Sequence, residues 1–181
     1  MKGVHGLVKE VIYNGKSYIA KLIKKEEDGI IDESNFILEL KSPRIVRVNN
    51  IFTKSVEGET YHLILMEKAP FRSLGEFNYY LHNKNLLNLI YKWPFEIVGD
   101  NLLRFFAKQI VESLELLNKS NYSHFDIKPK NILIFPEMNL KLSDFNLLRN
   151  PEKNKNDKNN LGYQEGQLDI FRQNFIKIML L

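Results

Sequence analysis

The chain has 181 residues, of which 44% are apolar and 27% charged, with a net charge of +4 and no cysteine. This composition argues against wholesale disorder, and the lack of cysteine excludes a disulfide framework or a thiolate metal site. No apolar run is long enough to span a membrane, no signal peptide is evident, and no basic stripe with interleaved aromatics suggests nucleic-acid binding. We therefore expect an intracellular protein, folded as one domain or two small lobes, whose oligomeric state stays open.

The first 23 residues have the pattern of β-structure. Residues 3–8 lead into a stretch rich in strand-forming residues at 9–13, and a second such stretch at 17–23 follows Asn14-Gly15, which is a strong hairpin signal. Gly3 and Gly6 precede the first strand, and such glycines allow backbone amides to approach a phosphate. A simple hairpin without a ligand explains these two glycines at least as well.

A short helix and a second hairpin are predicted next. Glu33 opens a segment with apolar residues at helical spacing, which ends before Ser42-Pro43. Residues 44–48 are predicted to be strand, and a hairpin between residues 51 and 66 completes a small antiparallel sheet. Residues 67–70 then leave the sheet as an extended connector.

A long amphipathic helix is the strongest helical signal in the chain. Asp100 is its predicted N-cap, and one broad apolar stripe follows. The stripe consists of Leu102, Leu103, Phe106, Ile110, Val111, Leu114 and Leu117. Residues 78–99 before it are poorly patterned, and packing explains Trp93 better than function does. We expect this helix to be structural and to present the loop that follows it.

That loop, at residues 123–134, carries the residue types that organise the chain. Asp126, Lys128 and Asn131 precede an apolar run, and Asp144 follows a second one. Pro136 suits a turn between the two runs, so a two-stranded ribbon would bring both carboxylates and the amide to one end. One carboxylate to accept a hydroxyl proton, with an amide and a second carboxylate to hold Mg²⁺, meets the needs of phosphoryl transfer from ATP. An ordinary surface hairpin is the alternative.

Two stretches of contrasting composition end the chain. Residues 150–160 have almost no apolar side chain and are predicted to be mobile, whereas residues 168–181 have the pattern of an apolar helix.

The order and spacing of these features resemble the protein kinase family. His124-Phe125-Asp126 stands where the family has His-Arg-Asp, and Asp144-Phe145-Asn146 stands where it has Asp-Phe-Gly. The resemblance implies an α+β, bilobal kinase-like fold, divergent and truncated at both ends. It consists of a small antiparallel-sheet N-lobe with one helix at 1–66, a hinge at 67–72 and a mainly helical, incomplete C-lobe at 73–181.

The same resemblance implies a role for individual residues, with ATP and Mg²⁺ as cofactors and a protein as partner. Asp126 and Lys128 would be catalytic, and Asn131 and Asp144 would bind the metal. The residues implied to contact the nucleotide are Gly3, Gly6, Val8, Lys21, Glu33, Met66, Glu67 and Ala69. Lys21 would pair with Glu33, with Glu39 as the alternative partner. Asp169 would support the loop backbone, and Glu165 would be a remnant of a later family motif.

Lys128, two residues after Asp126, is similar to the lysine of serine/threonine kinases and implies transfer to serine or threonine hydroxyls of a protein. Three alternatives remain: a catalytically impaired kinase fold used as a scaffold or nucleotide-binding module, a small-molecule phosphotransferase, and an inert fragment. Phe125 cannot pair with phosphate, so it is expected to pack against apolar neighbours. Asn146 is expected to adopt the left-handed backbone conformation that glycine would otherwise supply.

Overall fold

The computed structural model describes residues 7–24, 36–81 and 100–150, which divide between two compact units. The first unit comprises Met1–Lys68 and the second Ala69–Leu181. Their boundary falls within the connector predicted at residues 67–72. Gly3, Gly6, Glu33, Trp93, Glu165 and Asp169 lie outside the described residues, as do the segments predicted to be mobile and helical after residue 150.

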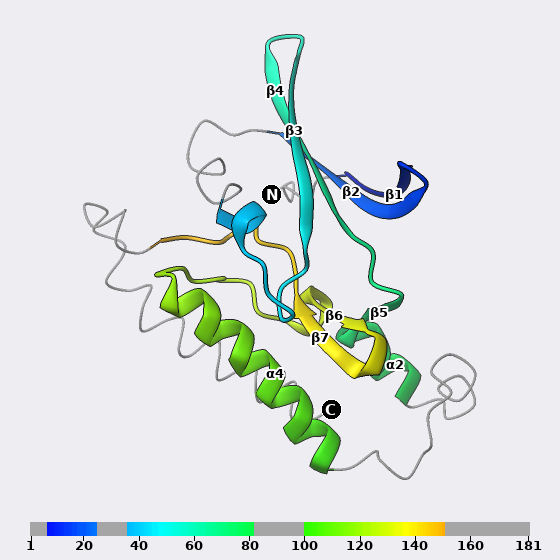
Figure 1. The fold of residues 1–181 in the computed structure, drawn as a ribbon, viewed down its shortest axis with the longest axis vertical. Coiled ribbons are helices and arrows are strands. Elements are labelled where there is room, and N and C mark those ends of the chain that lie inside the picture. The colour runs from blue at the N-terminus through cyan, green and yellow to red at the C-terminus, as the bar shows by residue number, and fades with distance from the viewer. Residues whose placement is uncertain (1–6, 25–35, 82–99, 151–181) are drawn as a thin grey trace. The chain divides into compact units, whose positions relative to one another are not determined.

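The first unit is built on a four-stranded antiparallel sheet (Figure 1). Its strands are β1 (Leu7–Tyr13), β2 (Lys16–Lys24), β3 (Val48–Val56) and β4 (Glu59–Glu67), in the order β1-β2-β4-β3. The predicted Asn14-Gly15 hairpin is present, with φ of 49° and 73° at its two turn residues. Left-handed values at both positions are typical of the two-residue turns whose twist matches that of paired strands.

The segment between β2 and β3 departs from the predicted strand at residues 44–48. The described part of the predicted helix is a single turn at residues 36–39, and β3 begins only at Val48. A turn occupies the residues between, because Ser42 Oγ accepts a hydrogen bond from the Arg44 amide at 3.1 Å. Ile45 and Val46 are nevertheless buried, so this stretch contributes to the core.

The second unit combines a three-stranded sheet with two described α-helices. The sheet has the order β5 (Phe71–Ser73), β6 (Ile132–Phe135) and β7 (Asn139–Leu142). Helix α2 (Leu74–Leu81) begins with a capping box. The Ser73 amide donates to Glu76 Oε2 at 3.1 Å, and the Glu76 amide donates to Ser73 Oγ at 3.3 Å.

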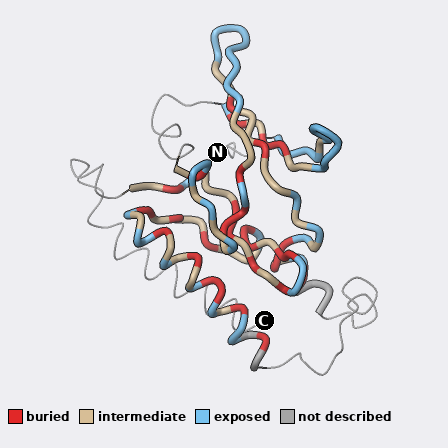
Figure 2. The backbone as a smooth tube through the Cα atoms, in the orientation of Figure 1, coloured by how far each residue is buried: buried red, intermediate tan, exposed pale blue. Residues whose placement is uncertain are grey.

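Helix α4 (Asp100–Lys119) packs along the β6–β7 ribbon, as Figure 1 shows. Four of the predicted stripe residues are buried, namely Leu102, Phe106, Ile110 and Leu117, and Figure 2 shows buried segments recurring along this helix. Val111, however, is exposed, and the polar Gln109 is buried. The Gln109 amide is satisfied by the ribbon, since Nε2 donates to the Met138 carbonyl and Oε1 accepts from the Leu140 amide.

None of the helices in the described ranges has the length and apolar content needed to cross a membrane.

Candidate functional site

The segment that precedes Asp126 and the segment that follows Asp144 are tied together by their backbones. Ser123 and Arg149 form an antiparallel bridge in which each amide donates to the other residue's carbonyl, at 2.9 and 3.0 Å. The β6–β7 ribbon closes the same loop from the other side, with Ile132 opposite Leu142. Two stretches 18 residues apart in sequence thus have a defined register.

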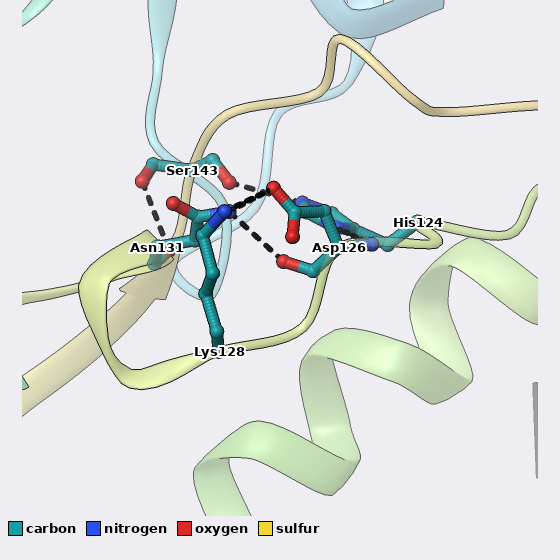
Figure 3. Close-up of polar contacts among 5 residues, drawn as sticks. All are labelled: His124, Asp126, Lys128, Asn131 and Ser143. Carbon is teal, nitrogen blue, oxygen red and sulfur yellow. Dashed lines mark hydrogen bonds and ion pairs between the residues drawn. The ribbon is translucent and has the colours of Figure 1, made fainter. Parts of the chain in front are cut away.

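The carboxylate of Asp126 is held through one of its two oxygens (Figure 3). Oδ2 accepts hydrogen bonds from Lys128 Nζ at 2.7 Å and from Asn131 Nδ2 at 2.9 Å. Within the described residues Oδ1 accepts none, and the side chain is 27% exposed. The carboxylate is therefore oriented by two donors and keeps one oxygen for a further donor.

Asn131 connects this carboxylate to the segment that carries Asp144. Its side chain is buried, and Nδ2 donates to both the carboxylate and the main-chain carbonyl of Asp126. The main-chain carbonyl oxygen of Asn131 accepts hydrogen bonds from the amide of Ser143 at 2.8 Å and from Ser143 Oγ at 2.9 Å. Because Nδ2 is engaged twice, Oδ1 is the amide atom left for a ligand.

His124 makes a second connection between the same two segments. It is 2% exposed, its Nε2 lies 3.0 Å from the Ser143 carbonyl oxygen, and its Nδ1 lies 3.2 Å from the Asp126 amide nitrogen. A carbonyl only accepts and an amide N–H only donates, so the ring is neutral with its proton on Nε2. Its edge also meets the ring of Phe145, with centroids 5.2 Å apart.

Burial is the main influence on this imidazole and lowers the pKa of His124. The Ser143 carbonyl and the negative charges of Asp126 and Asp144 act in the opposite direction. Since both carboxylates influence the one ring, His124 lies within electrostatic range of both.

Backbone strain in the site lies beside the carboxylates rather than at Asn146. Phe125 and Asp144 have φ of 60° and 62°, in the left-handed region that non-glycine residues rarely occupy. Asn146 does not have a positive φ, so the expectation that it replaces glycine in this conformation is wrong. Phe125 is half-buried.

In the first unit, three of the predicted nucleotide-binding residues share one face of the sheet. Val8 is paired with Lys21 across β1 and β2, and Met66 is paired with Ile19 two residues before Lys21. Residues paired across antiparallel strands, or two apart on one strand, point to the same face. Lys21 is only 9% exposed. Glu39, the alternative partner of Lys21, is exposed.

The predicted hinge residues lie at the end of β4 and in the connector after it. The Glu67 amide donates to the Arg47 carbonyl at 2.9 Å, and the Glu67 carboxylate accepts from the Arg47 amide at 2.7 Å. Ala69 is half-buried, in the extended stretch before β5.

The oxygen atoms available as metal ligands in the second unit are of the kind that Mg²⁺ binds. Asn131 Oδ1 and the Asp144 carboxylate are hard oxygen ligands, which this ion prefers, and no set of three His, Asp or Glu side chains competes for a metal within the described residues. Two protein ligands agree with the habit of Mg²⁺ of keeping water and substrate phosphates in its shell.

Sequence reasoning missed the two residues that tie the site together. Ser143 directly precedes the motif of Asp144 and His124 is the first residue of the motif of Asp126, but neither was given a role. Their signal is weak, because a serine before a carboxylate and a histidine two residues before one are common. Only the pairing of the two segments turns them into partners.

Comparison with known proteins places these features among protein kinases. The protein kinase domain family matches residues 2–165. Serine/threonine-protein kinase PKH2 of Saccharomyces cerevisiae is 30% identical over 149 residues, which is 77% of this chain and 12% of that protein. Serine/threonine-protein kinase CBK1 of Yarrowia lipolytica is 30% identical over 155 residues, 81% of this chain and 23% of that protein. The 3-phosphoinositide-dependent protein kinase B of Dictyostelium discoideum is 31% identical over 154 residues, 80% and 15% of the respective lengths. The chain thus spans less than a quarter of these relatives' length.

Proposed function

The chain belongs to the protein kinase domain family, and from this premise we propose that it transfers the γ-phosphoryl group of ATP to serine or threonine hydroxyls of a protein. The observation that carries the proposal is the state of Asp126. One carboxylate oxygen is fixed by Lys128 and Asn131, and the other accepts no hydrogen bond within the described residues. An oriented carboxylate with one open oxygen is what a substrate hydroxyl requires as proton acceptor.

In the proposed reaction the substrate hydroxyl donates its proton to Asp126 Oδ1. The hydroxyl oxygen forms a bond to the γ-phosphorus as the bond from that phosphorus to the β–γ bridging oxygen breaks, and ADP leaves with that electron pair. Lys128, held by Asp126 Oδ2, places an ammonium beside the transferring group and stabilises its negative charge.

Asn131 and Asp144 are the proposed metal ligands. Asn131 Oδ1 and the Asp144 carboxylate would hold Mg²⁺, which neutralises phosphate charge when bound. The hydrogen bonds from Ser143 to the Asn131 carbonyl set the spacing of the two ligands. His124 holds the same serine from its carbonyl side.

The nucleotide-binding roles of the first unit are part of the proposal. Lys21 would pair with the α- and β-phosphates and with Glu33, while Gly3 and Gly6 would offer backbone amides to phosphate. Of the other residues predicted to contact the nucleotide, Val8 and Met66 would border the adenine. Glu67 and Ala69 would contact the edge of the adenine through their backbones. The shared face of Val8, Lys21 and Met66 supports this assignment.

The proposal is tested by phosphate transfer and ATP binding measured on the same protein. Asp126→Asn removes the proton acceptor but not a nucleotide contact, so we expect transfer from labelled ATP to serine/threonine peptides to fall at least 100-fold. ATP affinity should stay within about threefold of the unsubstituted protein. Glu137→Gln, at an exposed turn, is the matched control and should change neither. Nucleotide binding without transfer in the unsubstituted protein would instead support a scaffold or nucleotide-binding module.

A further inference from the structure

Lys130 differs from the other cations near the candidate site. It is exposed, and it has no hydrogen bond or ion pair with any residue in the described part of the chain. Its neighbours are engaged, since Lys128 Nζ lies 2.7 Å from Asp126 and Arg72 Nη1 lies 3.1 Å from Glu76. The catalytic loop therefore carries one lysine directed at its own carboxylate and a second whose charge faces solvent.

The first part of the Lys130 side chain packs closely against α2 at Gly75. A Cβ added to Gly75 would lie 3.2 Å from Lys130 Cγ and 3.3 Å from the Lys130 amide nitrogen. The helix approaches the loop this closely only because position 75 has no side chain. Pro129 restricts the backbone before Lys130, and the buried Asn131 anchors it afterwards. The ammonium thus extends from a fixed point of the loop.

The nearest acidic side chain of α2 is already occupied. Glu76 Oε1 accepts from Arg72, and Glu76 Oε2 accepts from the amide and hydroxyl of Ser73. Asp126 is held by Lys128 and Asn131. Neither carboxylate serves as a counter-ion for Lys130, so an acidic group that arrives from outside meets a positive charge that no residue in ranges 7–24, 36–81 and 100–150 pairs with.

We propose that Lys130 is a specificity-determining residue that selects acceptor peptides with an acidic side chain close to the serine or threonine. This inference rests on the proposed function, because it takes Asp126 as the group that receives the hydroxyl. Lys130 is four residues after Asp126 in one loop, and an extended peptide advances only about 3.3 Å per residue. A peptide whose hydroxyl reaches Asp126 therefore passes Lys130 within a few residues. An acidic group there is attracted to the ammonium, and a basic one is repelled.

The test uses the full chain and peptides with a single serine that differ only in having aspartate or lysine at one of four positions on either side. At the position nearest Lys130, we expect kcat/KM to favour aspartate by three- to tenfold. Lys130→Ala should abolish this preference, and Lys130→Glu should reverse it. Lys119→Glu is the matched control, because Lys119 is exposed and lies about 20 Å along α4 from Phe106, the residue through which this helix contacts Phe77 of α2. It should leave the ratio unchanged.

A binding measurement separates failure of the inference from failure of the proposed function. Fluorescence anisotropy of the same peptides, with alanine in place of serine, reports recognition without turnover. A preference for aspartate that reverses in Lys130→Glu, without any phosphate transfer, would refute the proposed function and retain recognition by Lys130. Equal ratios in the unsubstituted protein and Lys130→Glu in both assays would overturn the inference, whatever the turnover. A preference for lysine in the unsubstituted protein would overturn it as well.

Discussion

The imidazole of His124 donates a hydrogen bond from Nε2 to the carbonyl oxygen of Ser143, across 3.0 Å. Its other nitrogen accepts from the Asp126 amide, so one buried ring connects the segment of the proposed proton acceptor to that of the proposed metal ligand. A second proton on the ring would place two donors, Nδ1–H and the Asp126 amide, against each other.

This relationship predicts a loss of stability in mild acid. The pKa of His124 is lowered in the folded protein, so between the folded and unfolded values the unfolded state binds more protons. The contribution of neutral His124 to the stability of the fold is therefore complete above pH 6.5, the ordinary pKa of histidine. It declines as the pH falls below this value. The free energy of unfolding by urea, measured from pH 8 to pH 5, should decrease in this window. His124→Gln should show a smaller decrease, and an identical pH dependence in this variant would contradict the assignment.

Asp144→Asn should remove the Mg²⁺-dependent part of ATP binding and leave the fold intact. The change keeps the size of the side chain but removes the charge that attracts the cation. The measurement is the rise in melting temperature caused by ATP, with Mg²⁺ and with a chelator. Equal Mg²⁺-linked stabilisation in the variant and the unsubstituted protein would exclude Asp144 as a ligand. The variant should melt without ligand within a few degrees of the unsubstituted protein.

Ser143→Ala should weaken the metal site by loosening the spacing of its two ligands. The change removes the hydrogen bond from Oγ to the Asn131 carbonyl, worth about 0.5–1.5 kcal/mol, and keeps the bond from the amide. We expect a several-fold higher Mg²⁺ concentration for half-maximal ATP binding. Ser113→Ala is the matched control, because it also removes a buried hydroxyl that donates to a carbonyl at 2.9 Å. A rise in the Mg²⁺ requirement of the same size in both variants would show a general loss of stability instead.

Any transfer activity should be independent of phosphorylation after Asp144. A phosphate-activated switch needs a cation that captures the phosphate and a hydroxyl that carries it. Phe125 replaces the family's arginine, and residues 150–160 contain no serine, threonine or tyrosine. Treatment with a phosphatase should leave activity unchanged, with mass spectrometry covering residues 143–168. Loss of activity that accompanies loss of phosphate from Tyr163 would refute the prediction.

Local signals explain which parts of the fold were predictable. Asn14-Gly15 fixes a hairpin through its own backbone preferences, and the stripe from Leu102 to Leu117 fixes a helix through its period. Features that depend on distant partners were not predictable. Val111 lies at an apolar position of the helix and is nevertheless exposed, whereas Gln109 is buried because the ribbon supplies partners for its amide.

The site shows the same division. The spacing of Asp126, Asn131 and Asp144 along the chain was sufficient to predict that they form one site. The two apolar runs between them were sufficient to predict the ribbon. The left-handed conformation was expected at Asn146 by analogy with glycine, but it occurs at Asp144 instead. Asp144 directly follows Ser143, whose hydrogen bonds to Asn131 connect two segments of the chain, and residue type alone does not reveal such contacts.

The buried amide of Gln109 couples the exchange behaviour of two elements that are distant in sequence. The Leu140 amide proton is bonded to a side chain of α4, so it can meet solvent deuterium only when the helix separates from the ribbon or the ribbon itself opens. Hydrogen exchange at this one amide therefore reports the docking of α4. If helix and ribbon open as a single cooperative unit, Leu140 should exchange with the protection of the helix centre rather than with that of a surface turn.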